Sequence, residues 1–343
     1  MYYLGCDVHR RQCTFHHMDQ DGSHGLQESV PTTPDSLIRF LDRLKDSAII
    51  TFEATGSYFW LSQLFQSHPM IAEVHIVDPR RSRKLAEELA VQAGYGRAKN
   101  DHIDAEMLAE IERKGLAPLI HAPTPEQLEQ RTINRHRFLL IRLRTRMINL
   151  VHSYIAMHSH EKLSLNDLKK GSVGAKIFFN SLPKYLQMII KKLVDIIELH
   201  NQQIRQFEKE LDKLLPENHP IIQIITSAPG FGLVLARTVL TEIIDIRYFK
   251  DHPKYLVSYS GLAPIEHNSD GKKGSIKLNR HCNYYLKYAF IEAAHAARNH
   301  PKYREKYQRD AKKLGKQIAK FNLARRLVKA IYWMLIHQQP FKH

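Results

Sequence analysis

Four carboxylates near the start of the chain have types and spacings suited to holding a divalent cation. Asp7 and Glu53 each stand at the end of an apolar stretch. Asp101 and Asp104 lie three positions apart where a helical pattern begins, so their side chains share one helix face. Clustered carboxylates repel one another unless cations lie between them, and Mg²⁺ held by carboxylates and a substrate phosphate is the usual solution. Two such ions can activate an attacking oxygen and stabilise a leaving one in phosphodiester chemistry.

Each of these acids also has a purely structural interpretation. Asp101 could be an acid at a helix N-terminus, where the helix dipole favours negative charge. Glu53 and Asp7 could be charges at strand ends that are satisfied by a local partner. The occurrence of all four together, at positions that one fold would bring close, favours the catalytic interpretation.

The elements that must position these acids follow from hydrophobic periodicity. Strands are predicted at 2–8, 12–18, 26–30, 48–53 and 74–77, with a turn at 20–23, and helices at 34–45, 58–67, 81–93 and 101–114. This order is that of the ribonuclease H-like fold, in the α/β class. Asp7 and Glu53 would then lie at the carboxyl ends of the first and fourth strands, where side chains of an open sheet project into a crevice.

Charge is distributed unevenly along the 343 residues. The chain has 51 Lys and Arg against 35 Asp and Glu, a formal net charge of +16, but residues 1–120 carry about −4 and the remainder about +20. A strongly basic segment suits a polyanion, because phosphate contacts release counterions. An acidic first domain then needs its own explanation, and a cation site supplies one. The three cysteines form neither a C-x-x-C pair nor a disulfide framework, and no run of about 18 apolar residues occurs, so we expect a soluble cytoplasmic chain without a membrane span.

The middle of the chain is helical and basic. Apolar residues at helical intervals predict long helices at 126–158 and 183–215, separated by a looser stretch at 164–174. Such helices suggest an antiparallel or intermolecular coiled coil with a role in dimerisation, although packing within one subunit is the alternative. Arg142 and Arg146 on the first helix are candidate nucleic-acid contacts. We therefore expect domains at 1–120, 121–218 and 219–343.

The last domain carries further nucleic-acid signals. A helix, a Pro-Gly-Phe-Gly turn and a second helix at 224–242 fit a helix-hairpin-helix, in which Gly230 and Gly232 would let the backbone approach a phosphate; an ordinary tight helical hairpin is the alternative. A Gly-rich polar loop follows at 261–275. The candidate phosphate-binding side chains are Lys272 and Lys273 in this loop and Lys277 and Arg280 just after it. The basic run at 301–329 fits a nucleic-acid groove or a solvated face, and the nearby tyrosines could stack on bases or cap a core.

Two sets of motifs resemble the DEDD transposases of bacterial insertion sequences. The first consists of Asp7-Val8, Glu53 in E-A-T-G and the string K-N-D-H-I-D-A that contains Asp101 and Asp104. In that family the N-terminal domain is similar to the Holliday-junction resolvase RuvC and is shared with pilin-gene invertases. The second set is G-L-A-P at 261–264, a polar loop, and R-x-x-N-x-x-L-K from Arg280.

The resemblance implies that a serine in this loop is the nucleophile. Alignment from Gly261 places it at Ser269. Asp270 stands where the family usually has glycine, which leaves Ser275 as an alternative, and Arg280-His281-Cys282-Asn283 replaces an R-G-N string.

The resemblance further implies a transposase or site-specific DNA recombinase that forms a phosphoserine intermediate with Mg²⁺ held by Asp7, Glu53, Asp101 and Asp104. Its expected partners are donor and target DNA, a structured guide RNA (bridge RNA) and further copies of the chain as a dimer or tetramer. Two alternatives remain open: a RuvC-like hydrolytic junction-resolving endonuclease, which would use the same acids with water as nucleophile, and a non-catalytic nucleic-acid scaffold.

Overall fold

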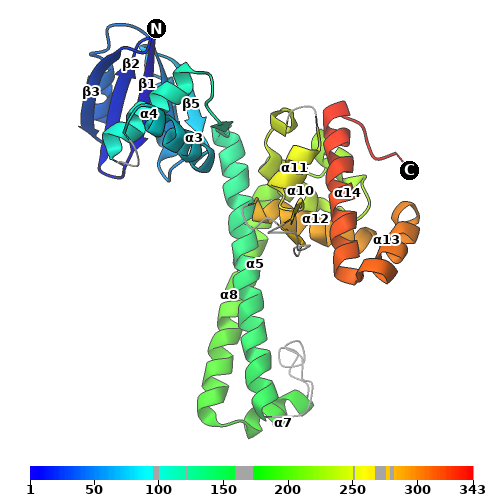
Figure 1. Cartoon of the computed structure of the whole chain (residues 1–343). Helices are drawn as coiled ribbons and strands as arrows, with labels where there is room; N and C mark the ends of the chain where they lie inside the picture. The colour runs from blue at the N-terminus through cyan, green and yellow to red at the C-terminus, as the bar shows by residue number, and fades with distance from the viewer. Residues whose placement is uncertain are drawn as a thin grey trace. The chain divides into compact units, whose positions relative to one another are not determined.

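The computed structural model divides the chain into two compact units, which we call unit 1 (Met1–Ala122) and unit 2 (Pro123–His343) (Figure 1). It describes residues 1–95, 100–120, 122–158, 173–249, 252–266, 276–278 and 282–342. Each unit has its own hydrophobic core. The expectation of a mixed α/β domain followed by a mostly helical region is confirmed.

Unit 1 is built on a six-stranded mixed sheet with the order β3-β2-β1-β4-β5-β6. The strands are β1 (Tyr2–Val8), β2 (Gln12–Met18), β3 (His24–Pro31), β4 (Ala48–Glu53), β5 (Ile71–Val77) and β6 (Leu119–Ile120). The first three form an antiparallel meander, β1, β4 and β5 run parallel, and β6 pairs antiparallel with β5. This arrangement is consistent with the ribonuclease H-like fold. The sequence did not predict β6, because two residues are too short to show alternation.

Helices cover both faces of this sheet. They are α1 (Pro34–Leu41), α2 (Tyr58–Gln66), α3 (Pro79–Gln92) and α4 (Asp101–Arg113). The alternate residues Leu4, Cys6 and Val8 of β1 enter the core that also contains residues of α1 and α2. Because side chains alternate across a strand, Gly5 and Asp7 face the opposite side, which carries α4. A smaller cluster joins α3 to α4.

Gly5 fixes how closely α4 approaches the sheet. A Cβ atom at this position would lie 1.9 Å from the Ala105 carbonyl oxygen and 2.6 Å from the Ala109 amide nitrogen. The helix backbone therefore rests directly on β1. Asp101 lies about one turn before Ala105, and Asp7 lies two residues beyond Gly5 on the same strand face, so this contact helps to bring the two acids together.

Unit 2 is mainly helical. Its helices are α5 (Pro125–His158), α7 (Val173–Ser181), α8 (Lys184–Leu214), α9 (Pro220–Thr226), α10 (Leu233–Ile243), η1 (Ile246–Phe249), α11 (Lys254–Tyr259), α12 (Tyr284–Ala297), α13 (Pro301–Leu314) and α14 (Lys316–His337). One antiparallel hairpin, β7 (Pro264–Glu266) with β8 (Ile276–Leu278), adds to them. The main core lies among α9, α10, α11, α12 and α14. No helix in the described part of the chain is both long and apolar enough to cross a membrane.

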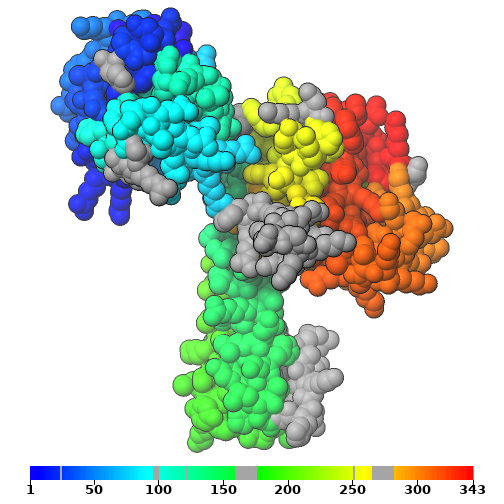
Figure 2. Space-filling view, in the orientation of Figure 1, coloured from blue at the N-terminus to red at the C-terminus, as the bar shows by residue number. Residues whose placement is uncertain are grey.

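The two long helices α5 and α8 pack antiparallel against each other within one chain. Val151 and Ile155 near the end of α5 share a core cluster with Leu186 and Ile190 near the start of α8. In the space-filling view the pair forms a narrow green projection from the rest of unit 2 (Figure 2). Packing within one subunit, which the sequence left open, therefore accounts for the apolar faces of these helices along this stretch.

The basic run near the C-terminus forms two helices. Gly315, with φ +87°, separates α13 from α14. Asp310 on α13 accepts a hydrogen bond from Asn322 at 3.3 Å and lies 3.6 Å from Arg326, which ties the two helices together. Tyr303 is buried in the core, so this tyrosine serves packing.

Candidate functional site

The carboxyl ends of β1 and β4 place Asp7 and Glu53 on the same face of the sheet. These strands are parallel neighbours, with Cys6 opposite Phe52, so the next residue of each strand is Asp7 and Glu53. Cys6 and Phe52 both point into the core that contains α1 and α2. Their successors therefore point to the face that carries α3 and α4.

The first turn of α4 brings a third acid to this position. Asn100 caps the helix by accepting a hydrogen bond from the Ile103 amide at 2.8 Å, so Asp101 is not used as the cap. Oδ1 of Asp101 lies 3.3 Å from Nε2 of His9. Asp104 follows on the same helix face, and its negative charge contributes to raising the pKa of Asp7. The structural interpretation of Asp101 as a helix-end acid does not account for its contact with His9.

His9 lies between the two aspartates. Its Nε2 is 3.0 Å from Oδ2 of Asp7 and 3.3 Å from Oδ1 of Asp101, and the ligand atoms of the three residues all lie within 4.8 Å of one another. Sequence reasoning missed this histidine. The available signal was its position two residues after Asp7, just beyond the end of β1. Within the described residues, this closely spaced group does not extend to Glu53 or Asp104.

The electrostatics of this cluster favour an added positive charge. Burial raises the pKa of Asp7, and the charges of Asp104 and Asp101 raise it further, whereas His9 lowers it. Conversely, the negative charge of Asp7 is the main cause that raises the pKa of His9. Carboxylates that oppose one another's ionisation bind a cation readily, because the cation replaces repulsion by attraction.

The donor chemistry of the site fits a divalent cation. Asp7 and Asp101 offer carboxylate oxygens, the ligands preferred by hard ions such as Mg²⁺, and their spacing lets one ion contact both. An imidazole nitrogen suits softer metals better. His9 therefore fits the role of a counter-charge for the aspartates at least as well as that of a Mg²⁺ ligand.

Glu53 has a fixed partner on α3. The Ser82 hydroxyl donates a hydrogen bond to Oε1 of Glu53 at 2.7 Å and also contacts the Asp78 carbonyl oxygen at 2.9 Å. Asp78 caps α3 through its side chain, which accepts from the Arg80 amide at 2.9 Å. The start of α3 thus holds Glu53 in place. Ser82 is a second residue that sequence reasoning missed.

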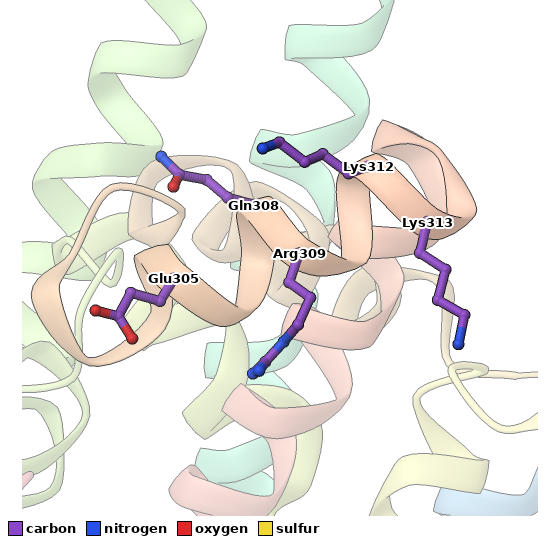
Figure 3. Close-up of a pocket in the computed structure, with 5 residues that line it drawn as sticks. All are labelled: Glu305, Gln308, Arg309, Lys312 and Lys313. Carbon is purple, nitrogen blue, oxygen red and sulfur yellow. The ribbon is translucent and has the colours of Figure 1, made fainter.

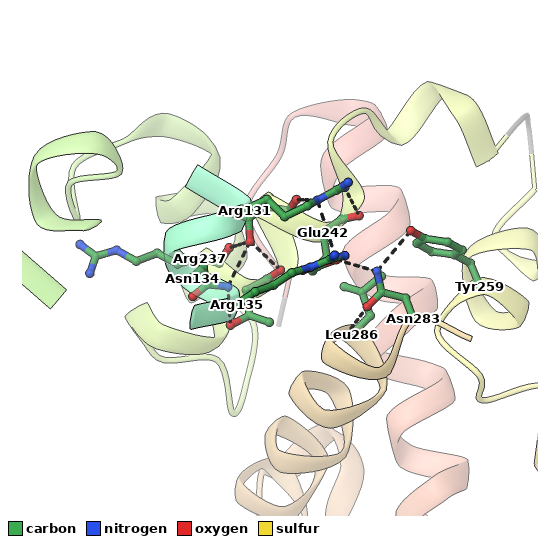
Figure 4. A network of polar contacts seen from close by, with 10 residues as sticks. Arg131, Asn134, Arg135, Arg237, Glu242, Tyr259, Asn283 and Leu286 are labelled. Carbon is green, nitrogen blue, oxygen red and sulfur yellow. Dashed lines mark hydrogen bonds and ion pairs between the residues drawn. The ribbon is translucent and has the colours of Figure 1, made fainter. Parts of the chain in front are cut away.

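A buried polar network connects the N-terminal part of α5 to other helices of unit 2 (Figure 4). Glu242 on α10 has a fully buried side chain and accepts two hydrogen bonds from Arg135, each at 2.7 Å. Asn283, the N-cap of α12, donates to the same carboxylate at 2.7 Å. Arg131 donates to the carbonyl oxygens of Thr241 at 3.0 Å and Glu242 at 3.2 Å. The network joins α5, α10 and α12.

Several arginines of the basic helix α5 have partners within the protein and are therefore structural. Besides Arg131 and Arg135, Arg137 bonds to Glu208 on α8 at 3.0 Å and Arg144 bonds to Asn201 at 3.0 Å. Arg142 and Arg146, the two that we selected as nucleic-acid contacts, are exposed.

The predicted helix-hairpin-helix segment comprises α9, the connection 227–232 and α10. Gly232 is the N-cap of α10, and a Cβ added there would meet no described residue beyond its chain neighbours within 4 Å. Gly230 has φ +88°, and a Cβ there would lie 2.1 Å from the Ala293 carbonyl oxygen, so this glycine also permits close packing against α12. Lys277 belongs to β8, opposite Ile265. Five further candidates lie outside the described residues: Ser269, Ser275, Lys272, Lys273 and Arg280.

α13 presents a basic surface. Its residues Glu305, Gln308, Arg309, Lys312 and Lys313 line a pocket (Figure 3). Arg309 and Lys313 extend to one side of the helix in this view, and Lys312 extends in another direction. Three cations against one acid make the pocket electropositive.

The fold and the acidic cluster define a class: an α/β domain consistent with the ribonuclease H-like fold, with carboxylates at the ends of its parallel strands, joined to a basic helical unit. Comparison with known protein families identifies the family within this class. A family model described as "Transposase" matches residues 4–158, and a second, described as "Transposase IS116/IS110/IS902 family", matches residues 222–308. The chain belongs to the IS110 family of insertion-sequence transposases.

Individual relatives agree with this assignment. The chain is 25% identical over 215 residues to the transposase for insertion sequence element IS1111A of Coxiella burnetii, covering 60% of this chain and 56% of the relative. It is 21% identical over 299 residues to the transposase for insertion sequence element IS1328 of Yersinia enterocolitica, covering 85% and 82%. A relative from Sinorhizobium fredii is 25% identical over 272 residues, covering 72% and 64%. The chain thus spans less than two thirds of the Coxiella and Sinorhizobium proteins.

Proposed function

We propose that the chain is a transposase that acts as a site-specific DNA recombinase and cuts and rejoins DNA through a covalent phosphoserine intermediate. The observation that carries this proposal is the convergence of Asp7 and Asp101 at one point of a ribonuclease H-like sheet, within the segment that matches a transposase family model. In this scheme residues 1–120 are the catalytic domain, 121–218 the helical coiled-coil region and 219–343 the domain that carries the nucleophile.

The proposed metal ligands are Asp7, Glu53, Asp101 and Asp104, with Mg²⁺ as the cation. When bound, the ion supplies Lewis-acid polarisation of the scissile phosphate. Asp7 and Asp101 provide the pair of closely spaced oxygens. Ser82 keeps Glu53 oriented toward the same face of the sheet. His9 partly neutralises the aspartates and thereby limits their mutual repulsion.

Ser269 is the proposed nucleophile, with Ser275 as the alternative. Its oxygen forms a bond to phosphorus while the bond from phosphorus to the deoxyribose oxygen breaks; the hydroxyl proton passes to a base, and the released sugar oxygen takes up a proton. A serine hydroxyl needs such assistance because its pKa is high. Strand exchange and the reverse reaction then rejoin the DNA, and the energy of the phosphodiester bond is kept in the protein link.

The proposed partners are donor DNA, target DNA and a structured guide RNA, in a complex that contains two or four copies of the chain. The basic charge of residues 121–343 supports a polyanionic partner. Exposed Arg142 and Arg146, the N-cap Gly232 and the electropositive pocket on α13 are candidate contacts. We place this activity in the bacterial cytoplasm, at the nucleoid.

A denaturing gel of protein incubated with Mg²⁺ and DNA carrying the element ends tests the mechanism. We expect a covalent protein–DNA adduct in the wild type, none in Ser269→Ala, and none in Asp7→Asn or Asp101→Asn. Cleavage without an adduct that survives Ser269→Ala would instead support the hydrolytic junction-resolving endonuclease. DNA binding without cleavage in every form would support a non-catalytic scaffold.

Metal binding can be tested without catalysis. Saturating Mg²⁺ or Mn²⁺ should raise the unfolding free energy of unit 1, by about 2.7 kcal/mol at a hundred times the dissociation constant. Asp7→Asn and Asp101→Asn should abolish this gain, whereas Glu87→Gln, at an exposed acid on α3 that pairs with Arg83, should retain it. An equal gain in all four proteins would show that the ions bind elsewhere.

A further inference from the structure

A cluster of aromatic side chains joins α5 to the start of α12 and is only partly covered. The Phe138 ring lies 6.0 Å from the ring of Tyr284, 5.2 Å from that of Tyr285 and 4.8 Å from that of Tyr288, in each case edge to face. Tyr284 and Tyr288 remain 49% and 36% exposed. Large aromatic rings that stay this accessible leave π-faces available to a ligand.

Arginines accompany these rings. The Arg142 guanidinium carbon lies 5.4 Å from the centre of the Tyr284 ring, and that of Arg135 lies 4.9 Å from the Tyr285 ring. Arg135 is held by the buried Glu242, so its position is fixed, whereas Arg142 is exposed. From Arg131 to the end of α5 the sequence contains no Asp or Glu. The cluster therefore lies on a cationic stretch of helix.

We propose that Phe138, Arg142, Tyr284 and Tyr288 form a platform that binds single-stranded DNA, with unpaired bases stacked on the tyrosine rings and an adjacent phosphate paired with Arg142. Proteins that bind single strands combine aromatic stacking surfaces with cationic side chains along the backbone, and every base offers a π-face, so no base-reading contacts are required. The inference rests on the proposed function, in which DNA strands are opened and exchanged.

Charge argues against a second copy of the chain as the occupant. In a two-fold symmetric contact the same patch meets itself, which would place this cationic stretch of α5 against its own copy. A polyanion instead neutralises it. Burial raises the pKa of Tyr288, and the charges of Glu292 and Arg137 act on it in opposite directions.

The stacking chemistry also selects unpaired over paired DNA. In a duplex the base faces are covered by neighbouring base pairs, and side chains reach only base edges and the backbone. The exposed rings of Tyr284 and Tyr288 therefore bind most favourably to bases that are unpaired and no longer stacked on their neighbours.

Binding of a fluorescent oligo(dT) to the full chain, followed by anisotropy in EDTA, tests the platform without any cleavage. Tyr284→Ala and Tyr288→Ala should each weaken binding roughly tenfold, as expected for loss of stacking on one base. Tyr284→Phe and Tyr288→Phe keep the ring and should bind as the wild type does. Tyr185→Ala removes a 59% exposed tyrosine on α8 and is the matched control, with unchanged binding expected.

Arg142→Gln separates the phosphate contact from stacking. It should lower the slope of log affinity against log salt by about 0.7, the value for one phosphate contact on a single strand. The alanine variants should leave that slope unchanged.

Several outcomes would overturn the platform. These are unchanged affinity in both alanine variants, an equal loss for duplex DNA of the same length, a loss confined to RNA oligonucleotides, and a change in oligomeric state without a change in DNA binding. The result is separable from the proposed function, because Asp7→Asn should bind oligo(dT) normally. Absence of recombination together with normal platform behaviour would refute the proposed function and leave the platform intact.

Discussion

Replacement of Glu242 by alanine should destabilise unit 2 markedly, because this carboxylate is the centre of the network that joins α5, α10 and α12. Its side chain has no exposed surface, and it accepts two hydrogen bonds from Arg135 and one from Asn283. The substitution leaves a guanidinium and an amide without their acceptor and also opens a small void.

The magnitude follows from the burial of the partners. Removing one member of a fully buried ion pair costs about 3–5 kcal/mol. Arg135 is 40% exposed and can recover part of its hydration, and Asn283 keeps its contact with the Tyr259 hydroxyl at 3.2 Å. We therefore expect a loss of about 2–3 kcal/mol in the unfolding free energy of unit 2.

The two tryptophans allow the unfolding free energy of each unit to be measured separately. Trp60 lies on α2 of unit 1, and Trp333 lies on α14 of unit 2, stacked on His337 with ring centres 5.6 Å apart. In a Trp60→Phe background, tryptophan fluorescence during urea unfolding reports on unit 2 alone. The reciprocal Trp333→Phe background should show an unchanged transition for unit 1.

Two matched variants separate the loss of the buried carboxylate from the general effect of removing an acid. Glu242→Gln keeps one acceptor oxygen and should lie between the wild type and Glu242→Ala. Glu210→Ala removes an exposed acid that pairs with Lys213 on α8 and should cost no more than about 0.5 kcal/mol. The reasoning would be refuted if Glu242→Ala shifted the unit 2 transition no further than Glu210→Ala does.

Two further predictions concern unit 1, with Trp60 as the reporter. Gly5→Ala should destabilise it by about 3 kcal/mol or more, because the new Cβ would overlap the α4 backbone. Gly56→Ala should have little effect, because a Cβ there would meet no described residue beyond its chain neighbours within 4 Å. Glu112, 2.9 Å from Nδ1 of His75, raises the pKa of that histidine above its ordinary 6.5. The stabilisation is therefore complete below pH 6.5 and is lost as the pH rises through the raised pKa. The stability advantage of the wild type over His75→Gln should shrink between about pH 6 and about pH 9, and an advantage that grows with pH would contradict this assignment.

The elements of unit 1 were largely predictable because their patterns are local. Alternation in Leu4, Cys6 and Val8 identified β1, and the apolar spacing of α1 and α4 gave those helices to within a few residues. The short strand β6 was not predictable, because its two residues pair with β5 only once the rest of the sheet exists.

In unit 2 the sequence pattern did not predict which arginines and tyrosines are buried or paired. Arg135 and Arg142 lie two turns apart on α5 and have the same residue type, yet one is held by a buried carboxylate and the other is exposed. Similarly, Tyr303 is buried while Tyr284 is accessible. Sequence periodicity indicates that a helix has an apolar face and a basic face, but not which basic residues meet a partner from α8 or α10.

The sequence by itself determined the acidic residues, their strand-end and helix-start positions, the basic character of the second part and the resemblance to a transposase family. These features depend on residue type and on spacing over a few positions. Only the tertiary structure placed His9 between Asp7 and Asp101, bound Ser82 to Glu53 and gathered aromatic rings from α5 and α12. Such contacts join segments that are distant in the chain, and they are set by how closely backbones can pack. At Gly5 that approach is possible only because the residue has no side chain.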